Sequence, residues 1–145
     1  MKISTKGRYA LRVMIELASA DNDKYTSIKT ISEHQKISEK YLEQILSSLN
    51  HAGFVKSTRG SQGGYKLLKS PEEYTVGMIL RNMEGSLAPV SCLDDNQNQC
   101  PNCNDCISLY VWEKIYDAVN DVVDKITIKD LIEHKNKTSA DNYKI

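Results

Sequence analysis

The apolar residues of the first half of the chain recur at spacings of three and four, as in helices with one buried face. We predict a first helix from Ser4 or Thr5 to about residue 21, a short second helix after Ser27, and a third helix that Ser38 caps and Gly53 ends. The inward stripes consist of Leu11, Met14, Ile15, Leu17 and Ala18, then Ile28 and Ile31, then Tyr41, Leu42, Ile45, Leu46 and Leu49.

Two short segments after the third helix predict a β-hairpin. Residues 54–58 and 65–69 resemble strands, and residues 59–64 between them hold three glycines. Helix, turn, helix and hairpin, in this order, are typical of a winged helix-turn-helix. We therefore predict a mainly α fold with a small β-hairpin wing, in which residues 1–72 form a DNA-binding unit.

The second half predicts further helices around one long loop. Thr75 is expected to cap a fourth helix that ends near Glu84, and residues 86–106 have the composition of a loop. A long helix is predicted from about residue 107 to residue 125, followed by a short helix from Thr127 to about His134. Residues 73–134 thus form a second unit, and residues 135–145 are expected to be a flexible tail.

The long helix carries an apolar heptad seam. Its members follow one another at spacings of three, four, three and four, and they are Trp112, Ile115, Val119, Val122 and Ile126. Such a seam predicts a dimerisation helix in a homodimer, which would present two winged units to a palindromic site. The alternative is a helix that packs only on its own domain.

Charge separates the two halves of the chain, although the net charge is zero. Residues 1–70 hold 12 basic and 6 acidic side chains, and residues 71–145 hold 7 basic and 13 acidic ones. The first half is therefore the part suited to a polyanion. Its candidate DNA-binding residues are Lys40, Tyr41, Glu43 and Gln44 in the third helix and Arg59, Gly60, Ser61, Gln62 and Gly63 in the wing.

These residue types suit different parts of a duplex. Lys40 fits a phosphate or a guanine, Gln44 fits an adenine edge, and Arg59 fits a narrow minor groove. Glu43 repels phosphate, so it either accepts from a cytosine amine or penalises wrong sequences. The alternative is an ordinary glycine-rich hairpin on a helical scaffold.

All four cysteines lie within fifteen residues, at Cys92, Cys100, Cys103 and Cys106. In a reducing compartment, such clustered cysteines favour a metal site or redox thiols over disulfides. The compact run from Cys100 to Cys106 is closer to iron–sulfur spacing than to the paired knuckles of a zinc site. Structural zinc and free redox thiols are the alternatives.

Other function classes receive little support from the sequence. No apolar run reaches the roughly 18 residues of a membrane span, and the N-terminus lacks the apolar core of a signal peptide. We therefore expect a cytoplasmic protein with no membrane partner. We recognise no nucleophile–base pair or carboxylate pair, and we expect no enzymatic activity.

Several motifs together resemble the IscR/NsrR/CymR-type winged-helix transcription regulators of bacteria. They are the opening STKGRYA, Ser38 with the segment YLEQ at residues 41–44, the glycine-rich wing from Arg59 to Tyr65, and the segment from Cys106 to Trp112. The resemblance implies a homodimer that binds palindromic promoter DNA, with Lys40, Glu43, Gln44 and Arg59 at family DNA-binding positions. It also implies an iron–sulfur cluster that senses iron–sulfur supply, nitric oxide or redox state.

The sequence departs from this family pattern at the expected cluster. Similar cluster-assembly regulators have a histidine three residues after the last cysteine, where this chain has Leu109, and this chain has an additional cysteine in the pair Cys100 and Cys103. The nitric-oxide-sensing branch can use an acidic residue where this chain has Arg8. We predict four cysteine ligands, with [2Fe–2S] favoured over [4Fe–4S]. The alternatives are a cluster-free regulator, with structural zinc or control by a partner enzyme, and a small iron–sulfur electron carrier.

Overall fold

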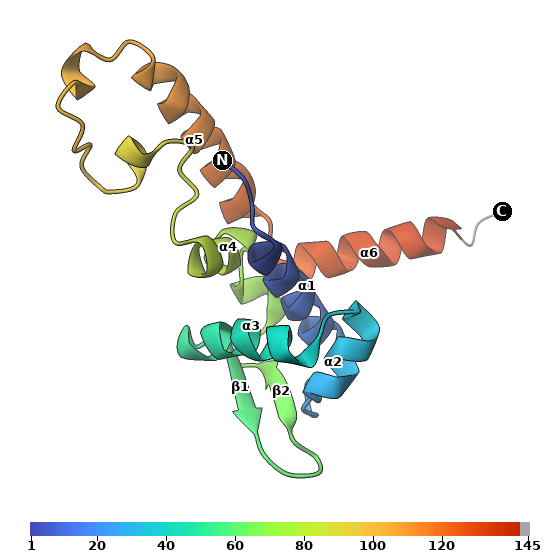
Figure 1. The fold of residues 1–145 in the computed structure, drawn as a ribbon. Coiled ribbons are helices and arrows are strands. Elements are labelled where there is room, and N and C mark those ends of the chain that lie inside the picture. Colours follow the sequence, from blue (N-terminus) through green and yellow to red (C-terminus); the bar gives the residue numbers. More distant parts are fainter. Residues whose placement is uncertain (143–145) are drawn as a thin grey trace.

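The computed structural model describes residues 1–142, which contain six α-helices and one two-stranded antiparallel sheet (Figure 1). In chain order the elements are α1 (Thr5–Ser19), α2 (Ile28–Gln35), α3 (Glu39–His51), β1 (Val55–Thr58), β2 (Gly64–Leu67), the 3-10 turn η1 (Pro71–Glu73), α4 (Val76–Glu84), the 3-10 turns η2 (Ser91–Leu93) and η3 (Cys103–Asp105), α5 (Leu109–Lys125) and α6 (Ile128–Asn142). This is the winged-helix arrangement that the sequence predicts.

Four hydroxyl side chains set the starts of the first four helices. Ser4 accepts a hydrogen bond from the backbone N–H of the third residue beyond it, and Ser27, Ser38 and Thr75 do the same, with distances of 3.1–3.2 Å. Each bond satisfies a backbone donor that a helix start otherwise leaves free, which stabilises the helix by about 1 kcal/mol. These four predicted starts are confirmed.

The hydrophobic core lies where α1 crosses α3 and α4. Its fully buried aliphatic side chains are Ala10, Val13 and Met14 of α1, Ile31 of α2, Leu42, Ile45, Leu46 and Leu49 of α3, Val55 of β1, Ile79 of α4 and Ile128 of α6. Each Leu, Ile, Val or Met buried in this way contributes roughly 1.5–3 kcal/mol relative to an exposed position. The core therefore joins both predicted units, because α4 and α6 share it with the helices of residues 1–72.

A buried tyrosine ties the hairpin to the start of the second unit. The Tyr74 hydroxyl donates to the Phe54 carbonyl and accepts from the Lys69 N–H, both at 2.9 Å. Burial raises the pKa of Tyr74. The rings of Phe54 and Tyr74 pack edge-on, with their centres 5.8 Å apart. Both ends of the hairpin are therefore held against the core.

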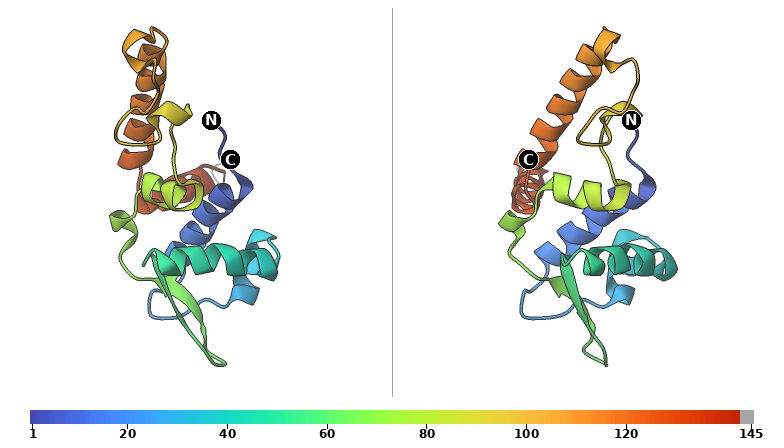
Figure 2. Two further views of the ribbon diagram at one scale, coloured as in Figure 1. Left: turned by 60° about the vertical axis from the view of Figure 1, so that its left-hand side comes forward. Right: turned by 90° about the vertical axis from the view of Figure 1, so that its left-hand side faces the viewer.

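Helix α5 projects from this body, with the cysteine-containing loop beside it and the wing at the opposite end of the molecule (Figures 1 and 2). Backbone hydrogen bonds hold its base. The Val76 N–H donates to the Ile126 carbonyl and the Ile128 N–H donates to the Tyr74 carbonyl, each at 2.9 Å. The start of α4 and the turn between α5 and α6 are therefore joined directly.

Helix α5 begins at Leu109, close to the predicted start near residue 107, because the preceding residues continue the turn of the loop. The predicted end of the last helix is wrong. Helix α6 continues to Asn142 rather than ending near His134. Residues 135–141 are exposed and include no glycine or proline, so the helix continues past its packed first turns. Residues 143–145 of the predicted tail lie outside the described residues.

Candidate nucleic-acid interface and cysteine loop

Helix α3 presents one polar face to solvent and one apolar face to the core. Lys40, Glu43 and Gln44 are exposed, while the aliphatic residues between them are buried. Tyr41 is half-buried, and its ring meets the Tyr9 ring of α1 edge-on at 5.8 Å. Three of the four predicted residues of this helix are thus free to reach a ligand, and Tyr41 instead packs against α1.

The wing tip is a tight turn that leaves its polar side chains in solvent. The Gly63 N–H donates to the Gly60 carbonyl at 3.0 Å, and Gly60 has a φ of 106°, which favours glycine. A Cβ at Gly63 would clash with the Thr58 carbonyl. Arg59, Ser61 and Gln62 are exposed around this turn, so the structure brings the predicted wing residues together at one tip.

The base of the wing is joined to the start of α2. Thr26 and Tyr65 exchange two backbone hydrogen bonds, of 2.9 and 2.8 Å, which extend the hairpin by a short bridge. Gly64 lies against Thr26, where any side chain would meet the Thr26 carbonyl. The wing is therefore fixed relative to α2, whose C-terminal turn leads into α3.

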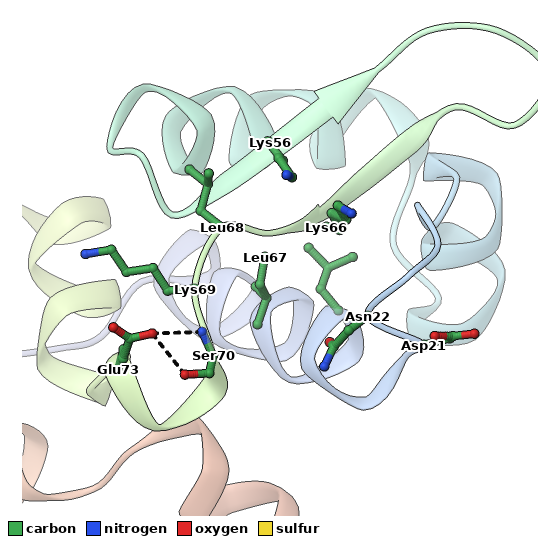
Figure 3. A pocket seen from close by; sticks show the side chains of 10 residues that line it. Asp21, Asn22, Lys56, Lys66, Leu67, Leu68, Lys69, Ser70 and Glu73 are labelled. Atoms are coloured by element: carbon green, nitrogen blue, oxygen red, sulfur yellow. Dashed lines mark hydrogen bonds between the residues drawn. The ribbon is translucent and has the colours of Figure 1, made fainter.

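A polar hollow of about 480 Å³ lies between the hairpin and the end of α1 (Figure 3). Lys56 and Lys66 are directly opposite each other in the hairpin, and the Lys66 ammonium lies 4.8 Å from the centre of the Tyr25 ring. Glu73 at the rim accepts from Ser70, which lowers the pKa of Glu73. The hollow thus carries two facing ammonium groups, and these add to the positive charge of the hairpin.

The four cysteines lie in the loop of residues 86–108 and are free thiols. Cys92, Cys100 and Cys103 are half-buried and Cys106 is exposed. Within residues 1–142, no three histidine, cysteine, aspartate or glutamate side chains gather closely enough to hold a metal ion. The structure places the thiols in one loop without bringing them to one point.

The donor set nevertheless fits an iron–sulfur cluster chemically, because four thiols match its usual ligands. Hydrogen bonds described for this loop are local. The Cys103 N–H donates to the Cys100 carbonyl at 3.2 Å, and the Cys106 and Ser108 side chains are 3.4 Å apart. Such local turns leave the loop able to change its path without breaking a bond to the core.

The apolar residues of α5 divide between two faces. Val119 and Ile126 of the predicted seam, together with Tyr116 and Val123, pack on the cluster formed by Val76, Leu80 and Leu87. Ile115 and Val122 remain 37% and 56% exposed, beside Val111 at 48%. Trp112 is half-buried. The exposed stripe is therefore Val111, Ile115 and Val122, and Ile115 and Val122 are the members of the predicted seam that stay exposed in the single chain.

This stripe continues into an apolar groove of about 440 Å³. The groove is lined by Met1, Ile3, Leu80, Leu87, Ile115, Ala118, Val119, Val122 and Val123. The N-terminus, α4 and α5 thus form one continuous apolar surface, and no segment of residues 1–142 covers its exposed part.

An arginine clamp that the sequence analysis missed joins α4 to α5. The Arg81 guanidinium donates to both carboxylate oxygens of Asp124, at 2.6 and 3.0 Å, and to the Asn120 side-chain oxygen at 2.8 Å. These bonds lower the pKa of Asp124. Gly77 lies under the clamp, where a Cβ would clash with Asp124 and Arg81. Arg81 and Asp124 are 43 residues apart, so no local sequence signal indicates their pairing.

Residues 3–134 match the family Rrf2, described as iron-dependent transcriptional regulators. The chain belongs to the Rrf2 family. Among its relatives, the HTH-type transcriptional regulator CymR of Bacillus subtilis is 45% identical over 131 residues, which cover 90% of this chain and 89% of CymR. This Rrf2 chain is therefore a transcriptional regulator, like its relatives, and not an enzyme.

Solved structures of Rrf2 relatives share the fold. CymR, the global cysteine regulator of B. subtilis, has a TM-score of 0.76 at 42% identity, and the match covers 92% of this chain and 98% of the CymR chain. T. potens IscR has a TM-score of 0.76 at 37% identity, and the match covers 95% of this chain and 90% of the IscR chain. No helix among the described residues of this Rrf2 protein is long and apolar enough to cross a membrane.

Proposed function

We propose that this Rrf2 protein is a dimeric, DNA-binding regulator that senses iron–sulfur status, nitric oxide or redox state through a cysteine-ligated iron–sulfur cluster. The observation that carries the sensing part is the position of the thiols. All four lie in a locally hydrogen-bonded loop that leads directly into α5, the helix with the exposed apolar stripe. A change in this loop therefore acts on the start of the proposed dimer helix.

DNA recognition is assigned to α3 and the wing. The exposed Gln44 amide suits a base edge in the major groove, and Lys40 suits a phosphate or a guanine. Arg59 at the wing tip suits a narrow minor groove. The bridge between Thr26 and Tyr65 supports this assignment, because it keeps the wing and the helix-turn-helix in one rigid unit.

The four cysteines are the proposed ligands of the cluster, with [2Fe–2S] favoured. A bound cluster would be held by these four thiolates and would supply a redox-active centre, and its loss would leave the thiols without a metal. Cys100 and Cys103 are already joined in a turn, and Cys106 lies just before α5. Gathering these thiols would fix the loop against the start of α5.

Two observations favour a second candidate, a cluster-free regulator. The identity to CymR of B. subtilis is 45%, and Leu109 occupies the position where similar cluster-assembly regulators have a histidine. In this alternative the loop holds structural zinc, or its thiols stay free and a partner enzyme controls the regulator.

Anaerobic purification followed by absorption spectroscopy and analysis of iron, sulfide and zinc separates these candidates. A brown protein with iron and sulfide is expected, and Cys106→Ser should lose most of both, whereas Ser91→Ala in the same loop should keep them. A colourless protein with zinc would favour the structural-zinc form. A colourless protein without metal would favour control by a partner enzyme.

A further inference from the structure

The function proposed above makes no use of the polar hollow between the hairpin and the end of α1 (Figure 3). We infer that this hollow binds a small organic anion of the phosphate-monoester class, held by the ammonium groups of Lys56 and Lys66. The inference goes beyond the proposed DNA binding and does not rest on it. The volume of the hollow, about 480 Å³, lies in the usual range of small-molecule sites.

The two lysines at this hollow are an unfavourable pair without a ligand. Lys56 of β1 and Lys66 of β2 lie directly opposite each other in the antiparallel hairpin. Residues in this relation share one face of the sheet, with Cβ atoms about 4.5–5.5 Å apart, and like charges there are destabilising. Neither lysine belongs to an ion pair described for residues 1–142. One anion with two negative charges, shared between both ammonium groups, would remove this repulsion.

An aromatic contact orients one of the two lysines. The Lys66 ammonium lies 4.8 Å from the centre of the Tyr25 ring, and the Lys66 side chain is half-buried. A lysine held in this way loses less conformational freedom when it binds an anion. The backbone bridge between Thr26 and Tyr65 joins the loop that carries Tyr25 to β2. The two sides of the hollow are therefore fixed relative to each other.

The rest of the lining suits the organic part of such a ligand. The hollow has an apolar surface formed by Leu17, Leu67 and Leu68. In Figure 3, Asn22 lies across the hollow from Lys56 and Lys66, and its amide has both donors and an acceptor. Apolar surface with a few polar groups around it is the usual composition of a small-molecule site.

Two carboxylates in the lining limit the size of the ligand. Glu73 accepts two hydrogen bonds from Ser70, of 3.0 and 2.9 Å, and Asp21 accepts one from the Asp23 N–H at 3.0 Å. Both carboxylates are thus bound within their own loops rather than to the lysines. They repel the continuous row of phosphates along a duplex, whereas a small anion reaches the lysines without passing along them. The hollow therefore favours a small anion over the DNA backbone.

The test titrates the purified full-length, isotope-labelled protein with phenyl phosphate and, separately, with inorganic phosphate, at constant ionic strength. At about pH 7.5 both probes carry close to two negative charges. Amide chemical shifts report where each probe binds and how tightly. We expect saturable shifts at residues 21–25, 56 and 66–70. Phenyl phosphate should bind more tightly than inorganic phosphate, because its ring covers the leucine surface.

Variants of the two lysines test the assignment directly. Lys56→Gln and Lys66→Gln should each weaken binding of phenyl phosphate at least about tenfold, because each removes one charge-assisted hydrogen bond. Lys56→Arg keeps the charge and should restore most of the affinity. In low salt without a ligand, Lys56→Gln should melt at or above the wild-type temperature, because the opposed like charges are gone. Such a result would show that the lost binding is not lost folding.

Lys114→Gln is the matched control. Lys114 is also exposed and also lies over a tyrosine ring, 5.4 Å from the centre of Tyr110, but it belongs to α5, which projects away from the hairpin (Figure 1). This variant should bind phenyl phosphate as the wild type does.

Equal affinities of the wild type and both glutamine variants would overturn the inference, as would shifts that sodium chloride reproduces. A wild-type protein that binds neither phosphate would overturn it too. In that case, a salt slope of binding to a mixed-sequence duplex that falls by about 0.9 in each glutamine variant would assign both lysines to DNA phosphates instead. Failure to bind any duplex would reject the proposed function and leave this inference intact, because the titration contains no DNA.

Discussion

At the scale of single residues, Gly64 shows how a missing side chain holds two elements together. Gly64→Ala would place a Cβ against the Thr26 carbonyl, whereas Gly53, whose φ of 75° is also positive, has open space around it. We expect Gly64→Ala to lower the free energy of unfolding by about 2–4 kcal/mol and Gly53→Ala by about 1 kcal/mol. Urea denaturation of both variants measures the difference. Equal losses would show that the approach to Thr26 is not the constraint.

Also at this scale, Gln44 and Arg59 should contribute to DNA recognition in different ways. Gln44→Ala should weaken binding by about 1–3 kcal/mol at one base pair and relax the preference there. Arg59→Ala should weaken binding most where the minor groove is narrow. Affinities of both variants are measured on a duplex that the wild-type protein enriches from a random library, and on single-base variants of this enriched duplex. A uniform loss for Gln44→Ala would remove it from base recognition.

At the scale of elements, the clamp between α4 and α5 should make the free energy of unfolding depend on pH in the acidic range. Asp124 has a pKa below its usual 3.8, chiefly because Arg81 donates hydrogen bonds to it. The folded state therefore binds this proton less readily than the unfolded chain. The contribution of Asp124 is complete above pH 3.8 and is lost as pH falls through the lower folded value.

Asp124→Asn removes this contribution. Both partners are partly exposed, so we expect a loss of about 0.5–1 kcal/mol at neutral pH, which shrinks as the solution is acidified. Asp121→Asn is the control, because it breaks only the exposed pair with Lys125, and it should change stability by less than about 0.5 kcal/mol. Thermal unfolding across pH measures both. If the stability difference between Asp124→Asn and the wild type stayed constant in acid, Asp124 would not be the source of the pH dependence.

The elements that could be predicted from the sequence are those whose signals are local. Ser4, Ser27, Ser38 and Thr75 each mark a helix start by a bond to a residue three positions away, and all four starts are confirmed. The end of α6 was missed because no glycine or proline follows its packed part. Local chemistry therefore fixes where helices begin better than where an exposed helix ends.

The faces of α5 could not be predicted in the same way. A heptad pattern gives the apolar residues but not the element that each one meets, and here α4 takes Val119 and Ile126 while Ile115 and Val122 stay exposed. The clamp of Arg81 and the positive φ of Lys36 also depend on distant contacts or on backbone geometry. The candidate DNA-binding residues of α3 and the wing could be proposed from the sequence because each group lies on one short element.

At the scale of the whole molecule, the cysteine loop and the wing lie at opposite ends (Figures 1 and 2). The path between them runs along α5, through the clamp on Arg81, and into α4, which shares the core with α1 and α3. A loop rearrangement that tilts α5 would therefore move the winged unit as a body. In a dimer joined through α5, such a tilt changes the separation of the two wings rather than the shape of either one.

If α5 joins two chains as proposed, dimer formation should be a condition for tight DNA binding. Val122 is 56% exposed in the single chain, so Val122→Asp should leave the monomer folded but bury an unpaired charge in the proposed dimer. We expect this variant to sediment as a monomer and to bind the enriched palindromic duplex at least about tenfold more weakly, because one half-site contact replaces two. Leu68→Asp, at a 48% exposed leucine beside the hairpin, adds the same charge away from α5 and should remain a dimer. A Val122→Asp dimer with wild-type affinity would show that the stripe of Val111, Ile115 and Val122 is not the dimer surface.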